Sequence, residues 1–268
     1  MATALTIAGS DSGGGAGIQA DLKTFAALGV YGTSAITAVT AQNTRAVEGV
    51  FTLTPDEVVR QIDAVASDIR PDAVKTGMLA NAGIVAAVAD AIQRWTLRPI
   101  VVDPVMVSKS GHHLLSADAV ESVLRRLIPL AAVVTPNRLE AEVLSGRSVT
   151  TLEESREAAR VLHGHGAAAV VIKGGHFEGP TVVNLLFDGH AFTEFATPRL
   201  DTRNTHGTGC TFASAIAAQL ARGRSLPDAI EGATAYVAGA MRHGPAIGQG
   251  HGPLDHFWMQ RQQEVLPG

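Results

Sequence analysis

The sequence has little cysteine, few aromatic residues and a small net charge, and each shortage disfavours a class of protein. One cysteine stands among 268 residues, so the chain can form no internal disulfide and fits a reducing compartment. Aromatic residues make up 4% of the chain, which argues against a stacking surface for bases or sugars. The formal net charge is −4 without any basic block, which argues against a nucleic-acid partner.

Long apolar runs are missing as well. No stretch approaches the roughly 18 apolar residues that a membrane-spanning helix needs, and residues 1–5 do not read as a secretory signal. We therefore expect a cytoplasmic protein with no membrane contact. Hydrophobic residues make up 46% and charged residues 17%, so the chain can bury a sizeable core. Because no linker, repeat or composition shift divides the sequence, we expect a single domain over residues 1–268.

Short apolar runs alternate with longer amphipathic stretches along most of the chain, which predicts a mostly parallel sheet with helices on both faces. The expected strands are 5–8, 33–39, 73–76, 100–103, 132–135 and 168–173, and the expected helices are 20–28, 55–69, 82–94, 117–127 and 153–164. Helix 55–69 is marked by Thr54, Pro55 and Glu57, a capping-box pattern. Farther on we expect a hairpin of 181–187 with 191–195, helices 208–221 and 226–241, and an irregular tail after Gly244.

Polar and glycine-rich residues follow six of the expected strands. In open parallel sheets ligands bind outside the carboxyl ends of the strands, so these residues are the first candidates for a site. They stand at 9–15, 42–43, 75–77, 103–104, 135–137 and 173–175.

The most informative motif is Asn-Thr-His-Gly-Thr-Gly-Cys-Thr at 204–211, directly before an apolar helix. Its glycines allow a sharp turn, and the unpaired amides of such a helix start can bind an anion. The same positive field is expected to lower the pKa of Cys210. The alternative is an ordinary helix start in which Cys210 is a small buried side chain.

The glycine-rich segment 13–17 could belong to a dinucleotide-binding turn. The acidic residue expected after the second strand is absent there, and the gap between strand and helix is too long. A loop closing over a small substrate fits better, with Asp21 and Gln42 as polar contacts. Gln42 carries both donors and an acceptor, which suits a planar nitrogen heterocycle, although a solvated glutamine is the plain alternative.

No Walker motif, hydrolase elbow or zinc spacing occurs in the sequence. Asp103 ends a buried strand, and Asn137 and Glu140 share one face where a strand enters a helix. Together they suit Mg²⁺ held near phosphates, and Lys173 could reach a nucleotide phosphate. A helix cap, a solvated acid and a structural lysine are the alternatives for these residues.

Taken together, the motifs resemble the hydroxymethylpyrimidine/phosphomethylpyrimidine kinases of thiamine biosynthesis, in the ribokinase superfamily. The resemblance runs from about residue 6 to 244. It is carried by Gly-Gly-Ala-Gly-Ile-Gln-Ala-Asp at 14–21, Ala-Val-Thr-Ala-Gln-Asn at 38–43, Lys-Thr-Gly-Met-Leu at 75–79, Val-Asp-Pro-Val-Met at 102–106, Thr-Pro-Asn-Arg-Leu-Glu-Ala-Glu at 135–142, Lys-Gly-Gly-His at 173–176 and the motif at 204–211. It implies a three-layer α/β/α sandwich, use of ATP and Mg²⁺, and a homodimer.

The resemblance also assigns roles to residues. The pyrimidine substrate would lie near Gly9, Asp21, Gln42, Met78 and Val105. The metal would lie at Asp103 and Glu140, and ATP at Lys173, Asn137 and Thr208. Gly207, Thr208 and Gly209 would form the anion hole, Cys210 would be the catalytic base, and 108–115 would be a lid. The family often phosphorylates the alcohol and then its monophosphate.

Three other functions stay open at this point. A pyridoxal kinase of the same superfamily would also act on a small hydroxymethyl heterocycle. A nicotinamide-dependent oxidoreductase would use the glycine-rich segment 13–17. A ligand sensor without catalysis would keep the scaffold, although the set of Cys210, Asp103 and Lys173 argues against it.

Overall fold

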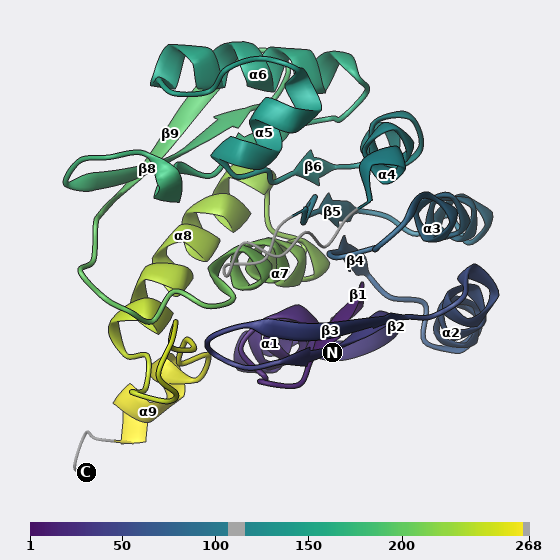
Figure 1. Cartoon of the computed structure of the whole chain (residues 1–268), viewed down its shortest axis with the longest axis horizontal. Coiled ribbons are helices and arrows are strands. Elements are labelled where there is room, and N and C mark those ends of the chain that lie inside the picture. The colour runs from purple at the N-terminus through teal and green to yellow at the C-terminus, as the bar shows by residue number, and fades with distance from the viewer. Residues whose placement is uncertain (107–115, 265–268) are drawn as a thin grey trace.

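A mixed β-sheet forms the middle layer of the computed structural model, which describes residues 1–106 and 116–264 (Figure 1). In this part of the chain the sheet has nine strands in the order β3-β2-β1-β4-β5-β6-β7-β8-β9. Strands β2, β1, β4, β5, β6 and β7 are parallel, while β3, β8 and β9 are antiparallel additions at the two edges. The strands are β1 (Thr3–Asp11), β2 (Tyr31–Gln42), β3 (Val47–Thr52), β4 (Ala73–Thr76), β5 (Ile100–Val102), β6 (Val133–Val134), β7 (Val170–Ile172), β8 (Thr181–Phe187) and β9 (Phe192–Pro198).

Helices cover both faces of this sheet. In Figure 1, α2, α3 and α4 lie to the right of the strands, and α1, α7 and α8 lie to the left. The helices are α1 (Gly17–Ala27), α2 (Pro55–Asp68), α3 (Ala82–Arg94), α4 (Ala117–Ser122), α5 (Arg138–Ser145), α6 (Leu152–Gly164), α7 (Thr208–Ala221), α8 (Leu226–Arg242) and α9 (Trp258–Glu264), with short turns at Val123–Leu127, Ile128–Leu130 and Gly174–His176.

The two faces of the sheet carry separate hydrophobic cores. Neighbouring strand residues point to opposite faces, so Val102 packs with α2 to α6 while Val101 packs with α1, α7 and α8. Strands buried on both faces read as continuous apolar runs, which is how they were recognised in the sequence. The three-layer α/β/α sandwich expected from the sequence is therefore confirmed.

Local signals account for several of the boundaries. Thr54 and Glu57 form the predicted capping box at the start of α2, with Pro55 in its first turn. The expected helix 117–127 continues from α4 into a wider π turn at Val123–Leu127. The edge strand β3 was not predicted. The expected irregular tail is confirmed for residues 245–257, which contain no helix, but it was wrong for the segment that follows, where α9 forms and packs Trp258 against Gly239 of α8.

No helix within residues 1–106 and 116–264 is long and apolar enough to cross a membrane.

Candidate active site

A cavity of about 780 Å³ opens at the carboxyl ends of the parallel strands. All the site residues predicted from the sequence line this cavity except Asp21: Gly9, Gln42, Met78, Asp103, Val105, Asn137, Glu140, Lys173, Gly207, Thr208, Gly209 and Cys210. The fold thus brings together residues that are up to 201 positions apart, from Gly9 to Cys210. The expected lid 108–115 lies outside the described residues.

The start of α7 forms one wall of the cavity. Gly207 has a left-handed conformation with φ of 82°, and a Cβ at this position would lie 1.9 Å from the backbone oxygen of Gly15. A glycine is therefore required for both reasons. The amides of Gly209 and Cys210 have no protein acceptor within the described ranges, so they can bind an anion at the positive end of the helix.

Cys210 does not have the lowered pKa that the sequence analysis expected. Burial raises the pKa of the Cys210 thiol to about 11, although the Lys75 ammonium acts in the opposite direction. The prediction considered only the helix start, whereas removal from water disfavours the thiolate. The thiol is therefore protonated at neutral pH before any ligand binds.

Lys75 of β4, which lines the cavity, and Asp21 of α1, which does not, form a buried ion pair. Their Nζ and Oδ2 atoms are 2.8 Å apart, and both side chains are 0% exposed. Asp21 also accepts hydrogen bonds from Thr6 and Ser214, each at 2.6 Å. Burial disfavours the Lys75 ammonium, but the Asp21 carboxylate holds the pKa of Lys75 above its ordinary value.

These contacts correct the expected role of Asp21. Its carboxylate accepts from three donors of the chain, is 0% exposed and does not line the cavity, so it supports the site without contacting a ligand. Lys75 lies in the candidate segment 75–77, but no role was predicted for it. Its signal was a lysine inside an otherwise apolar strand, where a charge needs a buried partner.

A second lysine cluster lies at the cavity surface. Lys173 Nζ lies 2.7 Å from Asp103 Oδ1 and 3.8 Å from Glu140 Oε2. Burial disfavours the Lys173 ammonium, but Asp103 and Glu140 hold the pKa of Lys173 above its ordinary value. A Cβ on Gly209 would lie 3.3 Å from Lys173 Nζ and 3.8 Å from Asp103 Oδ2. This cluster therefore adjoins the free amides at the start of α7.

Asn137 and Glu140 form a capping box at the start of α5. Glu140 Oε2 accepts from the Asn137 amide at 2.8 Å, and Asn137 Oδ1 accepts from the Glu140 amide at 3.0 Å. The helix-cap alternative is thus correct for both residues. Both residues also line the cavity. Burial raises the pKa of Glu140 to about 7, with Lys173 opposing the shift.

The carboxylates of Asp103 and Glu140 are the candidate ligands for a divalent cation. No group of three or more His, Cys, Asp or Glu side chains that could hold a metal occurs in the described part of the chain. Mg²⁺ is often held by one or two carboxylates together with substrate phosphates rather than by a protein cage. Asp103 and Glu140 next to the anion-binding amides fit that second arrangement.

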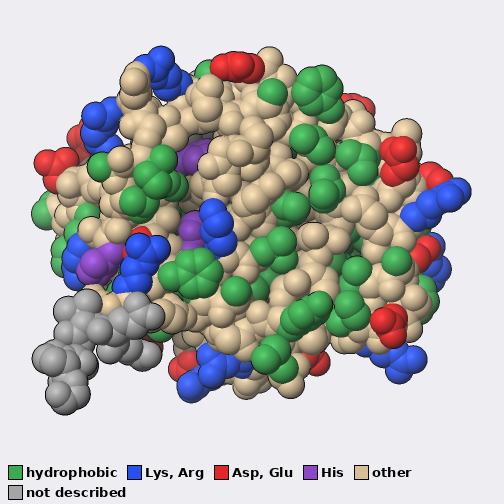
Figure 2. Space-filling model, turned by 90° about the horizontal axis from the view of Figure 1, so that it is seen from below, with side chains coloured by type: hydrophobic (Ala, Val, Ile, Leu, Met, Phe, Trp, Pro, Cys, Tyr) green, Lys and Arg blue, Asp and Glu red, His purple; other side chains and the backbone are tan. Residues whose placement is uncertain are grey.

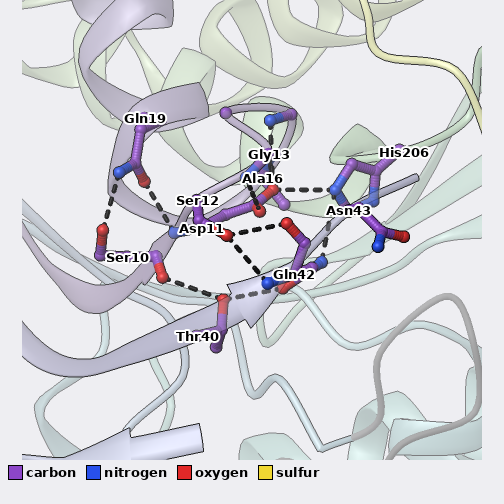
Figure 3. A network of polar contacts seen from close by, with 12 residues as sticks. Ser10, Asp11, Ser12, Gly13, Ala16, Gln19, Thr40, Gln42, Asn43 and His206 are labelled. Atoms are coloured by element: carbon purple, nitrogen blue, oxygen red, sulfur yellow. Dashed lines mark hydrogen bonds and ion pairs between the residues drawn. The ribbon is translucent and has the colours of Figure 1, made fainter. Parts of the chain in front are cut away.

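The glycine-rich loop after β1 is folded around its own aspartate. Asp11 Oδ1 accepts from the Gly13 amide at 2.8 Å, and Oδ2 accepts from the amides of Gly15 and Ala16 at 3.1 and 2.8 Å (Figure 3). These amides are therefore occupied by the protein, which argues against their use for the pyrophosphate of a dinucleotide.

His206 is a further residue that the sequence analysis quoted only as part of a motif. Its Nε2 lies 2.9 Å from Asp11 Oδ2 and 3.4 Å from the Gln42 side-chain nitrogen. His206 and Gln42 both line the cavity, close to Asp11 and Thr40. Gly9 and Met78 are in contact on the same wall, where a Cβ on Gly9 would lie 3.1 Å from the methionine sulfur.

The site combines three chemical elements in one cavity. The amides of Gly209 and Cys210 offer hydrogen bonds to an anion, and the Lys173 ammonium adds a positive charge beside them. Asp103 and Glu140 supply hard oxygen atoms, while Gln42 supplies a carboxamide on the cavity wall next to His206. Such a set can hold a phosphate next to a small polar heterocycle.

Comparison with known proteins gives consistent results. The family model described as phosphomethylpyrimidine kinase matches residues 11–255. The chain is 51% identical over 259 residues to the hydroxymethylpyrimidine/phosphomethylpyrimidine kinase of Bacillus subtilis, covering 96% of each protein. It is 53% identical over 253 residues to the thiamine biosynthesis bifunctional protein ThiED of Geobacter sulfurreducens, covering 94% of this chain and 52% of that protein. The chain therefore spans about half the length of this bifunctional relative.

A solved structure with the same fold belongs to a pyridoxal kinase. The ADP complex of Bacillus subtilis pyridoxal kinase superposes with a TM-score of 0.91 at 39% identity, covering 97% of this chain and 99% of that one. The fold expectation of a kinase-type α/β/α sandwich is confirmed by this match.

Proposed function

The chain belongs to the phosphomethylpyrimidine kinase family, and from this premise we propose that it uses ATP to phosphorylate 4-amino-5-hydroxymethyl-2-methylpyrimidine and then its monophosphate, in thiamine biosynthesis. The observation that carries the proposal is the position of the free Gly209 and Cys210 amides beside Lys173. They offer donors and positive charge to a phosphoryl group in transfer. The chain is accordingly an ATP-dependent phosphotransferase.

We infer that the γ-phosphate of ATP faces Gly207–Cys210, while the hydroxymethyl group of the substrate lies between it and Cys210. Phosphoryl transfer depends mainly on positioning and on stabilising the charge that spreads over the equatorial oxygens. Amides fixed at a helix start need no reorganisation to do this. Thr208 and Asn137 stand on the ATP side of the cavity in this arrangement, and Gln42 stands on the substrate side.

Mg²⁺ would be held by Asp103 and Glu140. When bound, this ion neutralises charge on the phosphates of ATP. The remaining steps belong to the chain: Lys173 orients a phosphate, and Cys210 takes the proton of the substrate hydroxyl. In a loose transition state that proton leaves late, so a single positioned base is sufficient.

The raised pKa of Cys210 gives this base a recognisable pH dependence. Because the pKa is about 11, the thiolate fraction increases about tenfold with each pH unit below that value. The ratio kcat/KM, which reports groups of the free enzyme, should therefore increase between pH 7 and 9 with a slope near one on logarithmic axes. The Cys210→Asp variant should keep part of the rate without this slope, because a carboxylate is ionised throughout.

The second phosphorylation needs space for a substrate that already carries a phosphate. The cavity volume of about 780 Å³ supports this, because drug-sized ligands bind in cavities of ~300–1,000 Å³. Lys173 supplies a positive charge near the same wall. Two-step phosphorylation is therefore part of the proposal and needs its own measurement.

We propose a homodimer formed through the β2–β3 face. Figure 2 views the molecule from the side on which β2 and β3 lie in Figure 1 and shows hydrophobic side chains gathered across it. Tyr31, Val39 and Phe51 on these strands are 55%, 43% and 65% exposed. A second copy would cover this apolar surface. ATP as phosphoryl donor and a single cysteine agree with a cytoplasmic location.

The test is incubation with Mg-ATP and the pyrimidine alcohol, followed by mass spectrometry of the products. We expect the monophosphate first and the diphosphate later, with pyridoxal phosphorylated more slowly in a parallel reaction. The Cys210→Ala variant should lower kcat by roughly 10²–10⁴ with little change in ATP binding. A Cys210→Ala enzyme with full activity would exclude the base, and preferential phosphorylation of pyridoxal would favour the pyridoxal kinase instead.

A further inference from the structure

The side chain of Gln42 is held on the cavity wall by several residues of the chain. Ser12 Oγ lies 2.8 Å from both the backbone nitrogen and the backbone oxygen of Gln42, which fixes the end of β2 against the glycine-rich loop. The side-chain amide lies between two partners and places its oxygen 3.0 Å from Thr40 Oγ1 and its nitrogen 3.4 Å from His206 Nε2 (Figure 3). Because the two amide atoms have nearly the same shape, turning the amide by half a rotation exchanges their positions. The orientation of this amide decides which atoms a ligand meets.

The first partner, His206, presents a hydrogen-bond donor. Its Nε2 lies 2.9 Å from Asp11 Oδ2. Burial of Asp11 works against ionisation, but the hydrogen bonds from His206, Ala16 and Gly13 hold its pKa below the ordinary value. An ionised carboxylate can only accept. His206 Nε2 therefore carries a hydrogen and has no lone pair for Gln42, and this single hydrogen, directed at Asp11, can be shared only with an acceptor atom of Gln42.

The second partner, Thr40, presents an acceptor. Its hydroxyl has a single hydrogen, and the backbone oxygen of Ser10 lies 3.0 Å from Thr40 Oγ1. That carbonyl can only accept, so the hydrogen of Thr40 is used there. Thr40 Oγ1 is then left with lone pairs for Gln42. An amide nitrogen at His206 would bring two donors together, whereas an amide oxygen there satisfies both contacts.

We propose that His206 is a positioning residue for substrate recognition, which with Asp11 holds the Gln42 amide with its oxygen toward His206 and its nitrogen toward Thr40. One N–H and one oxygen lone pair of the amide remain for a ligand. They match a heterocycle that offers a ring nitrogen beside an amino group. This inference rests on the proposed function, because it takes Gln42 as the residue that contacts the pyrimidine.

His206→Leu removes the donor, and His206→Gln retains an N–H near the same place. We expect His206→Leu to raise KM for the aminopyrimidine alcohol about tenfold, the equivalent of one hydrogen bond, while kcat and the KM for ATP change less. His206→Gln should restore most of the affinity. Pyridoxal has a ring nitrogen but no amino group beside it, so its KM should change by less than about threefold. His190→Gln, on the exposed turn between β8 and β9, is the matched control.

A double-mutant cycle separates positioning from general damage to the fold. If His206 acts through Gln42, His206→Leu should change KM by less than about twofold in a Gln42→Ala background. Asp11→Asn, which leaves His206 itself unchanged, is measured in the same way with and without Gln42→Ala. It replaces His206→Leu as the test if that variant does not fold. Additive effects of Gln42→Ala and His206→Leu on KM would overturn the inference while leaving the kinase intact. A wild-type enzyme that does not phosphorylate the pyrimidine alcohol would overturn both.

Discussion

The two lysine–carboxylate groups of the site have similar nitrogen–oxygen distances but differ in how exposed their side chains are. Lys75 and Asp21 are 2.8 Å apart with both side chains 0% exposed. Lys173 and Asp103 are 2.7 Å apart, but the lysine is 13% exposed and Glu140 is a second carboxylate beside it. The first group, which we call closed, is fully buried and has one positive and one negative charge. The second is open to the cavity and has one more negative charge than positive once Glu140 is ionised, above its pKa of about 7.

This difference separates support from binding. The carboxylate of Asp21 accepts from Lys75, Thr6 and Ser214 and is 0% exposed, so a ligand in the cavity cannot reach it. Asp103 and Glu140 share one lysine, and an excess of carboxylate at a cavity surface favours a cation or a polar ligand. A fully buried, charge-balanced ion pair is therefore not evidence of ligand contact, whereas a cluster at the cavity surface with an excess of carboxylate is.

The largest expected effect comes from breaking the closed pair. Lys75→Met leaves Asp21 charged, buried and without its cation, which should lower the free energy of unfolding by about 3–5 kcal/mol. Urea denaturation followed by circular dichroism measures this. Lys173→Met should cost less, because cavity water can solvate Asp103 and Glu140.

Lys23→Met, on the exposed face of α1, is the matched control for a lysine that is not buried. Equal losses of stability in Lys75→Met and Lys173→Met would contradict the distinction between a closed and an open group.

The second expected effect concerns nucleotide binding at the open cluster. A ligand at a hundred times its dissociation constant stabilises the folded state by about 2.7 kcal/mol. Mg-ATP should therefore raise the melting temperature Tm of the wild type, and Lys173→Met should lose most of that increase. Thermal denaturation with and without Mg-ATP measures it. Lys23→Met serves again as control, and an unchanged ATP-dependent shift in Lys173→Met would remove Lys173 from the nucleotide site.

Much of the cavity could be predicted from the sequence, because the order of strands determines which chain segments meet at their carboxyl ends. Gln42, Asp103 and Lys173 each follow or end a strand, Gly9 lies near the carboxyl end of β1, and all four line the cavity. The capping box of Thr54 and Glu57 was equally predictable, because it depends on residues three positions apart.

The remaining errors concern contacts between distant residues. Asp21 and Lys75 pair across 54 positions, and no local pattern shows that the aspartate faces away from the cavity. The pKa of Cys210 was predicted from its helix start alone, whereas burial by several elements dominates it. Helix α9 forms in a segment with weak local signals and is held by the packing of Trp258 against α8. Each error has the same origin, which is tertiary packing that overrides a local preference.

The smallest expected effect is the pH dependence of the open cluster. Burial raises the pKa of Glu140 from 4.5 to about 7. The folded state then binds more protons than the unfolded state between these values, so the ligand-free wild type loses stability as the pH rises from about 4.5 to about 7. Glu140→Gln carries no such charge and can still cap α5 through its side-chain oxygen. Without Mg-ATP, the variant should be more stable than the wild type by roughly 1–2 kcal/mol at pH 8 and about equal at pH 4.5.

Urea denaturation at both pH values in the presence of a chelator measures this difference. Glu231→Gln, on the exposed face of α8, is the matched control and should show no change in relative stability between the two pH values. The contrary result is a free energy of unfolding that increases in the wild type, relative to Glu140→Gln, from pH 4.5 to 8. It would mean that the attraction of Lys173 for Glu140 outweighs both the burial of Glu140 and its repulsion by Asp103. The cluster would then be closed in the same sense as Lys75 and Asp21, and its reason for attracting a cation would disappear.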